Sequence, residues 1–185
     1  MKLIARSDGR LVTYATRLQQ GAATFQSTAA RELNTAGAAI RTQTIEAETD
    51  QTGLSKRTIT RAQQATRASA GNLTYVIRAG GGNVRLKFFK ARETLPGVSA
   101  APWNRRQVFA GTFIKGGRFP KRVGLGMGGH VFQRTSGDRL PITGGRSGLY
   151  IGRELVTGQT AATFERASMT VIGGIAVRVA ARILP

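Results

Sequence analysis

The amino-acid sequence predicts an α+β fold, in which a long N-terminal helix and a second, shorter helix precede a mostly antiparallel β-sheet and a C-terminal helix. Near both ends of the chain, apolar side chains recur every three or four residues, which is the spacing of one helix face. Between these stretches, short segments alternate apolar and polar side chains and are separated by glycine, proline and asparagine, as in strands. No internal repeat or sharp change of composition divides the chain. We therefore expect a single domain over residues 1–185.

The first helix is expected over residues 15–50, which are rich in Ala, Gln, Thr and Arg. Its apolar stripe is thin and mostly alanine, so a sheet or a neighbouring subunit must approach it closely; the stripe comprises Leu18, Ala22, Phe25, Ala29, Leu33, Ala36 and Ile40. The acidic residues Glu46, Glu48 and Asp50 follow near the expected C-terminus, where carboxylates oppose the helix dipole. We expect these acids either to pair with a neighbour's basic region or to be solvated.

A helix stop and a new helix start follow at Thr52-Gly53-Leu54-Ser55, where Ser55 can accept a backbone hydrogen bond as the N-cap. The second helix is expected to run to Thr66, which makes residues 15–66 a helical part. The C-terminal helix is expected over residues 158–183. Its apolar positions keep the three-or-four spacing: Phe164, Ala167, Val171, Ile175, Val179 and Ile183.

Residues 73–151 form the expected basic β part. Alternation over residues 73–78 and again over residues 84–89, across a run of three glycines and an asparagine, predicts a β-hairpin with a basic outward face. Further strands are expected at residues 107–114, 130–134 and 139–142. Residues 115–129 contain six glycines and four basic residues, which predicts a mobile loop that becomes ordered only against a partner.

Positive charge is the strongest signal in the composition. The chain has 28 Lys and Arg residues against 9 Asp and Glu residues, for a net charge of +19, and the excess is concentrated in residues 73–153. Two interpretations remain open: a solvated basic surface, or contact with an anionic partner such as nucleic acid. The residues expected to face DNA or to contact another subunit are Arg78, Arg85, Lys87, Lys115, Arg118, Lys121 and Arg122. No zinc-finger, helix-turn-helix or RNP sequence is present, so such binding would be nonspecific and sensitive to salt.

The usual residues of an active site are scarce. The chain has no cysteine and a single histidine, His130, which has no second imidazole or thiol to join it at a zinc site or in a nucleophile–base pair. The carboxylates are scattered, and the glycine run at residues 124–129 lacks the Lys-Ser or Lys-Thr of a P-loop. We predict a protein that is not an enzyme and uses no cofactor or metal, with His130 in a structural role.

No apolar stretch reaches the roughly 20 residues that span a bilayer. The first ten residues become polar before the core of a signal peptide could form. We therefore expect a soluble protein that is not exported and has no membrane partner.

Several short motifs carry a resemblance to a known family. In chain order they are Thr52-Gly53-Leu54, the stretch from Phe109 to Phe113, Val131-Phe-Gln-Arg134, Arg139-Leu-Pro-Ile142 and the stretch from Gly148 to Ile151. Together with the Ala- and Arg-rich N-terminal helix, they resemble the minor tail protein Z family of phages and prophages. The chain departs from the family after Ile142, where members usually show a Gly-Pro-Ser-Ile-Pro-like stretch and this sequence has Gly145-Arg-Ser-Gly-Leu.

The resemblance implies a noncatalytic structural protein of the virion, located in the tail or neck and made in the cytoplasm of a bacterial host. Such a protein completes the tail or joins it to the head around the DNA passage. The implied partners are further copies of itself in a ring, expected to be a hexamer by analogy with tail symmetry, other tail or neck proteins, and packaged DNA nearby. The charge alone also fits a free, nonspecific nucleic-acid-binding protein, which is the alternative.

Overall fold

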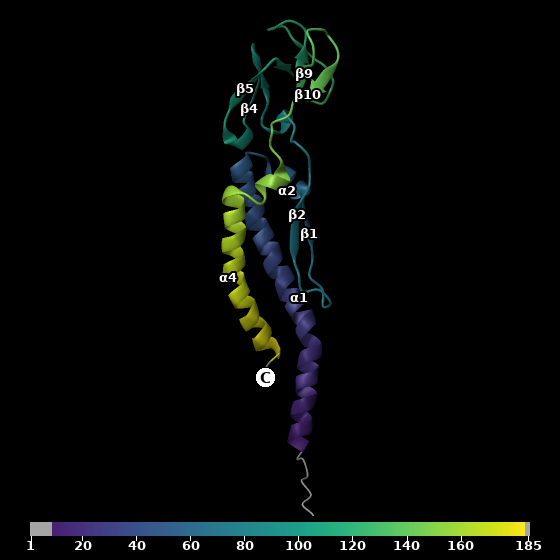
Figure 1. The fold of residues 1–185 in the computed structure, drawn as a ribbon, viewed down its shortest axis with the longest axis vertical. Helices are drawn as coiled ribbons and strands as arrows, with labels where there is room; N and C mark the ends of the chain where they lie inside the picture. Colours follow the sequence, from purple (N-terminus) through teal and green to yellow (C-terminus); the bar gives the residue numbers. More distant parts are fainter. Residues whose placement is uncertain (1–8, 184–185) are drawn as a thin grey trace, which may run out of the picture. The chain divides into compact units, whose positions relative to one another are not determined.

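The computed structural model describes residues 9–183, with side chains for residues 19–181 other than 22, 23 and 172. It confirms the α+β class (Figure 1). The helices are α1 (Gly9–Thr52), α2 (Lys56–Ala62), α3 (Ile151–Glu154) and α4 (Gly158–Ile183), with two short 3-10 helices, η1 (Leu86–Phe88) and η2 (Pro102–Asn104). The strands are β1 (Gln63–Thr66), β2 (Val76–Ala79), β3 (Arg92–Glu93), β4 (Gly97–Ala100), β5 (Gln107–Ala110), β6 (Thr112–Phe113), β7 (Lys115–Gly116), β8 (Val123–Gly124), β9 (Phe132–Arg134) and β10 (Ile142–Gly144).

The chain divides into two compact units. The helical unit contains residues 9–40, 65–76 and 166–183 of the described chain, and the β-rich unit contains residues 41–64 and 77–165. Two of the boundaries fall inside α1 and α4, where the helical pattern continues without a break. A sequence without a linker between the units therefore gives no sign of the division.

In the helical unit, the last part of α4 lies beside the middle of α1, and the first turns of α1 extend past it (Figure 1). The Nε of Arg178 is 3.0 Å from a carboxylate oxygen of Glu32, whose side chain is mostly buried. Ala29 and Ala36 of the predicted stripe are buried, as are Ala167 and Val179 of α4. The predicted stripe positions Leu18, Ala22 and Ile183 lie outside the described side chains.

The segment 65–76 is fastened to α1 within the same unit. The side-chain amide of Asn34 donates to the carbonyl of Ala68 (2.9 Å) and accepts from its backbone N–H (2.8 Å). The ring of Tyr75 lies directly against Gly37, where an added Cβ would lie 2.4 Å from the ring carbons. Glycine at this position is thus required for the ring to reach the helix backbone.

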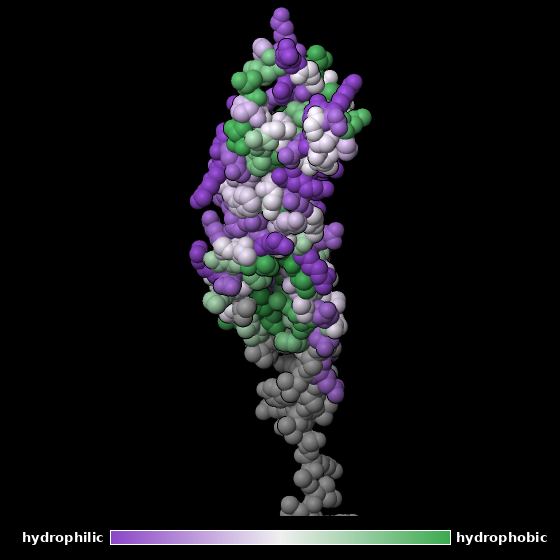
Figure 2. Space-filling model, turned by 45° about the horizontal axis from the view of Figure 1, so that its top comes forward, coloured by the Kyte–Doolittle hydropathy of each residue, from purple (hydrophilic) through white to green (hydrophobic). Residues whose placement is uncertain are grey.

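Large apolar side chains remain exposed in the helical unit. Phe25 of the predicted stripe is 46% exposed, and Met169 and Val177 of α4 are 77% and 69% exposed. Figure 2 shows apolar residues, drawn green, gathered in the lower half of the visible face. No helix of the described chain is long and apolar enough to cross a lipid bilayer.

The junction between α1 and α2 forms as predicted. Gly53 has φ +75°, and its N–H donates to the carbonyl of Thr49, which ends α1. The hydroxyl of Ser55 accepts from the N–H of Thr58 and caps α2. Leu54 between them is 2% exposed and belongs to the core of the β-rich unit.

The predicted end of the second helix at Thr66 is wrong, because α2 ends at Ala62 and β1 begins at Gln63. The side chain of Gln63 is buried and donates to the Glu48 carboxylate (2.7 Å), while its backbone carbonyl accepts from Arg41 (2.9 Å). These contacts hold Gln63 in an extended conformation. β1 then pairs with β2.

The predicted hairpin between residues 73–78 and 84–89 is also absent, because the second segment forms η1. Leu86 and Phe89 are each 1% exposed and both belong to the core. Residues three apart would point to opposite faces of a strand, whereas one 3-10 turn brings both to the same side. The strand-like alternation of residues 84–88 is therefore overridden by the burial of Phe89.

The β-rich unit contains two separate three-stranded antiparallel sheets, ordered β3-β4-β5 and β10-β9-β6 (Figure 1). The central strand β4 is buried throughout, with Val98 opposite Phe109 in the register. Gly111, with φ +70°, separates β5 from β6 and lets the chain pass from one sheet to the other. The core shared by these elements includes Ile59, Leu86, Val98, Val131 and Leu149.

The first turn of α4 is held by a side chain from the end of α1. The side-chain oxygen of Gln51 accepts from both the backbone N–H (2.9 Å) and the hydroxyl (3.0 Å) of Thr160. The amide nitrogen of Gln51 donates to Glu154 (2.7 Å). Gln51 thereby caps α4 from a position far away in the sequence.

Candidate nucleic-acid interface

Two of the predicted basic residues, Arg85 and Lys87, project from the same short turn. Arg85 is the N-cap residue of η1, and Lys87 is the middle residue of that helix. Their neighbours Leu86 and Phe89 are buried in the core, which directs the intervening side chains away from it. The packing of this turn therefore fixes where the two cations stand.

His130 is brought to this turn from a distant segment. Gly128 and Gly129 precede it with φ +60° and +67°, and the N–H of His130 donates to the carbonyl of Met127. Val131, which follows, is 2% exposed in the core, and its carbonyl accepts from Gly145 (2.8 Å). The tight glycine turn and the buried valine thus hold the imidazole in place.

The imidazole of His130 lies between the two cations. Its Nδ1 is 3.2 Å from Nη1 of Arg85, and its Nε2 is 2.9 Å from Nζ of Lys87. The Lys87 ammonium also lies 5.3 Å from the centre of the Phe88 ring, and the Phe132 ring lies 6.4 Å from the imidazole. We call Arg85, Lys87 and His130 the basic cluster.

The basic cluster contains more hydrogen-bond donors than acceptors. Guanidinium and ammonium groups only donate, and a neutral imidazole offers one acceptor nitrogen, so only one of the two contacts can be a proper hydrogen bond in either tautomer. Protonation of the ring would leave no acceptor at all. Partial burial, together with the positive charges of Lys87 and Arg85, lowers the pKa of His130 below its ordinary value.

No acidic side chain compensates the basic cluster within the described chain. The ion pairs between described residues include Lys56–Glu46, Arg122–Glu93 and Arg178–Glu32, and none of these includes Arg85 or Lys87. A further cation is close by, because the backbone of Arg146 forms a β-bridge with that of Arg85. The Arg146 guanidinium donates to the carbonyl of Asn83 (2.9 Å). The local charge is thus strongly positive and favours an anion.

The segment 115–129 differs from the mobile loop that the sequence predicts, because β7 and β8 pair within it. Glu93 anchors the base of this hairpin: one carboxylate oxygen accepts from the N–H groups of Ile114 (3.2 Å) and Lys115 (2.9 Å). The other oxygen pairs with Arg122. The sequence shows Glu93 only as an isolated acid in a basic region, so this anchoring could not be predicted.

The remaining predicted residues have different surroundings. Arg122 is partly buried, and its charge is paired with that of Glu93. Arg118 and Lys121 are exposed in the turn between β7 and β8, Lys115 is exposed on β7, and Arg78 is exposed on β2. The structure therefore joins only Arg85 and Lys87, of the seven predicted residues, to His130.

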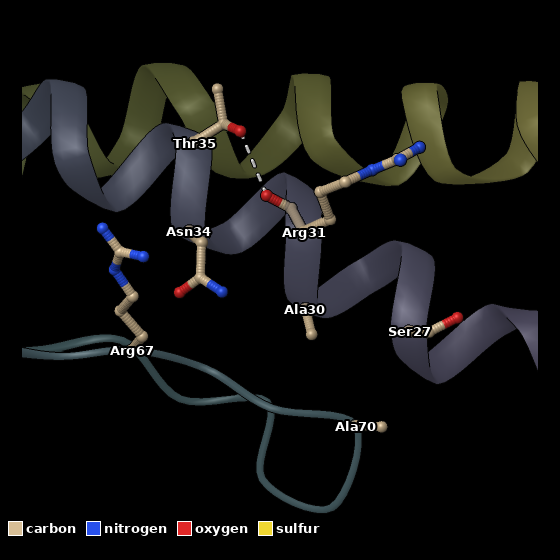
Figure 3. Close-up of a pocket in the computed structure, with 7 residues that line it drawn as sticks. All are labelled: Ser27, Ala30, Arg31, Asn34, Thr35, Arg67 and Ala70. Atoms are coloured by element: carbon tan, nitrogen blue, oxygen red, sulfur yellow. Dashed lines mark hydrogen bonds between the residues drawn. The ribbon is translucent and has the colours of Figure 1, made fainter.

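A shallow depression of about 550 Å³ in the helical unit is a weaker candidate (Figure 3). It lies between α1 and the segment 65–76, and its lining residues include Ser27, Asn34 and two arginines, Arg31 and Arg67. Arg67 points from its loop toward α1, whereas Arg31 points away from the depression (Figure 3). The two guanidinium groups do not converge, so they form no common anion site.

The acidic run of α1 is not solvated as a whole. Glu46 pairs with Lys56 and Asp50 is exposed, but Glu48 is fully buried against Gln63, which corrects the expectation for that residue. Burial raises the pKa of Glu48 to about 7, against the opposing effect of the Gln63 hydrogen bond. Nowhere in the described chain do three or more His, Asp or Glu side chains gather in a group that could hold a metal ion.

The position of His130 could not be found from the sequence, because it lies more than forty residues from its two partners. The only indication of this site in the sequence was the basic and aromatic character of residues 84–90. In comparisons with protein-family models, curated proteins and solved structures, nothing matches this chain.

Proposed function

We propose that this chain is a noncatalytic structural protein of a tailed-phage particle, in the tail or neck, whose β-rich unit faces packaged DNA. One observation carries the role beside nucleic acid: Arg85, Lys87 and His130 come together without an acidic partner among the described side chains. A phosphate backbone supplies the negative charge and the acceptors that this cluster needs.

The resemblance to the minor tail protein Z family supports the location in the particle. Its motifs include residues that build the β-rich unit: Leu54 and Val131 belong to the core, as do Leu149 and Ile151. Gly53 ends α1 with positive φ. Proteins that share a fold need similar residues in the core. Motifs that contain core residues are therefore the ones that members of a family would be expected to share.

Assembly into a ring is part of the proposal and has its own support. Phe25, Met169 and Val177 of the helical unit leave apolar surface open to solvent. Apolar positions of this kind are covered when subunits pack against one another in a closed ring. We propose a homo-oligomer, with a hexamer expected from tail symmetry, that contacts other tail or neck proteins.

A noncatalytic role agrees with the surroundings of the only histidine. A general base needs a neighbour that accepts its second N–H and stabilises the imidazolium. The charged groups that contact His130 are instead two cations, which oppose its protonation. The ring is therefore poorly suited to taking a proton from a substrate.

Mass spectrometry of purified particles tests the location. We expect the chain to be present at a fixed number of copies per purified particle. We also expect native mass spectrometry of the assembled protein to detect a closed homo-oligomer. Abundant protein in the infected-cell lysate together with its absence from purified particles contradicts the proposal.

The basic cluster also supports a second candidate, a free nonspecific nucleic-acid-binding protein. Such a protein binds DNA or RNA as a monomer, with an affinity that falls steeply as salt is raised. Tight binding by the isolated monomer, combined with absence from particles, would favour this second candidate over the first.

A further inference from the structure

The only histidine of the chain lies between two cations, and its ring cannot accept a hydrogen bond from both of them. The distances of 3.2 Å from Arg85 to Nδ1 and 2.9 Å from Lys87 to Nε2 leave one N–H facing a donor when the ring is neutral. Such an arrangement is unfavourable by itself. It becomes favourable once an anion supplies acceptor oxygens to all three groups.

We propose that Arg85, Lys87 and His130 bind a backbone phosphate of nucleic acid, and that His130 takes up a proton when the phosphate binds. The inference rests on the proposed role beside DNA and assigns that role to three named side chains. A phosphate has enough oxygens to accept from a guanidinium, an ammonium and an imidazolium at once.

A polyanion fits the surroundings better than a single small anion. Arg146 is joined to Arg85 through their backbones, and residues 73–153 carry fifteen basic side chains against two acidic ones. Neighbouring phosphates of one strand can therefore be neutralised together, with release of their counterions. Glu93 and Asp138, the two acids, are not among the charged groups that contact His130: these are Arg85 and Lys87, beside the uncharged Phe132 ring.

Proton uptake follows from the charges. In the free protein, partial burial and the two cations lower the pKa of His130. A bound phosphate adds negative charge and acceptor oxygens, which favour the imidazolium and raise that pKa. By linkage, DNA binding must strengthen as the pH falls through the range in which His130 titrates.

Proton NMR can test the inference directly, because the chain has only one histidine and an untagged protein gives one imidazole Hε1 resonance. The resonance is followed against pH with and without a short duplex DNA at low salt. We expect the pKa of His130 to rise on addition of DNA, and the affinity to be several-fold higher at about pH 5.5 than at about pH 8. The variant His130→Gln should lose most of this difference and retain the fold, which its melting temperature checks.

Two double variants with equal charge loss separate the cluster from the general basic surface. Arg85→Gln with Lys87→Gln should weaken DNA binding about tenfold or more and reduce the salt slope by about 2, the value for two lost phosphate contacts. Arg118→Gln with Lys121→Gln, in the exposed turn between β7 and β8, should weaken binding less than threefold, roughly the effect of distant screened charges.

Three other outcomes would overturn the inference, and a fourth would overturn only the proposed function. Equal losses in both double variants with an unmoved Hε1 resonance would show a diffuse basic surface, which leaves the proposed function intact. A resonance moved by inorganic phosphate but not by DNA would mean a small-anion site, and one moved equally by polyglutamate would mean an acidic protein partner. DNA binding through the cluster by a chain that is absent from particles would instead support the inference and reject the proposed function.

Discussion

The carboxylate of Glu48 accepts a hydrogen bond of 2.7 Å from the side-chain amide of Gln63 in a fully buried position. The other carboxylate oxygen of Glu48 and the side-chain oxygen of Gln63 are both buried without a hydrogen-bond partner. Desolvation raises the pKa of Glu48 to about 7, and the nearby negative charge of Glu154 adds to this effect. If the carboxyl of Glu48 is protonated, its O–H becomes a hydrogen-bond donor beside two oxygens, one of Glu48 and one of Gln63, that otherwise have none.

Replacement of Glu48 by glutamine should remove a pH dependence of stability. The folded state holds this proton more tightly than the unfolded state, so the contribution is complete below about pH 4.5 and is lost as the pH rises to about 7. The shift corresponds to roughly 3 kcal/mol at most. In urea unfolding at about pH 8, Glu48→Gln should therefore be more stable than the wild type by about 1–3 kcal/mol.

The control is Glu46→Gln, which changes an exposed acid of the same helix that pairs with Lys56. This substitution should change the free energy of unfolding by less than about 1 kcal/mol at about pH 8. A Glu48→Gln variant whose unfolding free energy keeps the wild-type slope against pH would contradict the assignment.

Glu93 should be needed for the β7–β8 hairpin. Glu93→Gln leaves the half-buried Arg122 without a counter-charge and weakens the acceptor for the N–H groups of Ile114 and Lys115. We expect a loss of about 1–3 kcal/mol and faster hydrogen exchange at those two amides. Asp138→Asn removes the same charge from an exposed site and should change neither. Equal effects of the two substitutions would show that Glu93 contributes only through long-range charge.

Gly37 should not tolerate a side chain. An alanine Cβ there would lie 2.4 Å from the Tyr75 ring, so Gly37→Ala should cost about 1–3 kcal/mol despite the higher helix propensity of alanine. Gly173→Ala in α4 meets no atom within 4 Å and should stabilise by about 0.5–1 kcal/mol. Thermal unfolding compares the two, and a stabilising Gly37→Ala would mean that the Tyr75 ring can move aside freely.

The cap on α4 should be visible as a loss of stability. Gln51→Ala removes the acceptor of two hydrogen bonds from Thr160, one of them from its buried hydroxyl. We expect a cost of about 1–2 kcal/mol in urea unfolding. Gln43→Ala on the exposed side of the same helix is the matched control and should stay within about 0.5 kcal/mol of the wild type. If both variants unfold alike, the cap contributes nothing.

Helix positions were largely predictable, because they depend on local spacing and on local capping. The stop at Gly53 and the cap at Ser55 each follow from residues within one turn. The hairpin prediction failed where a local alternation competed with the burial of Phe89. Strand β4 was missed because Gly97 follows a proline and looks like a turn, yet the close approach of the Phe109 carbonyl at this position admits only glycine.

The candidate site was half predictable for a related reason. Arg85 and Lys87 stand out through local charge, and proximity in the sequence places them on one turn. The roles of His130 and Glu93 depend on contacts between segments that are far apart in the sequence. Residue spacing within a segment cannot predict such contacts. The charge of Arg122 looked available in the sequence because its partner is 29 positions away.

The cap of Gln51 on Thr160 has a consequence for the order in which the chain folds. The two residues are 109 positions apart, so the first turn of α4 gains its acceptor only after a loop of that size has closed. Closing such a loop is entropically unfavourable and is offset only when the strands between the two ends have paired. Pairing of the strands between Gln51 and Thr160 should therefore precede docking of the first turn of α4, and in a nascent chain that turn would lack its cap until those strands have formed.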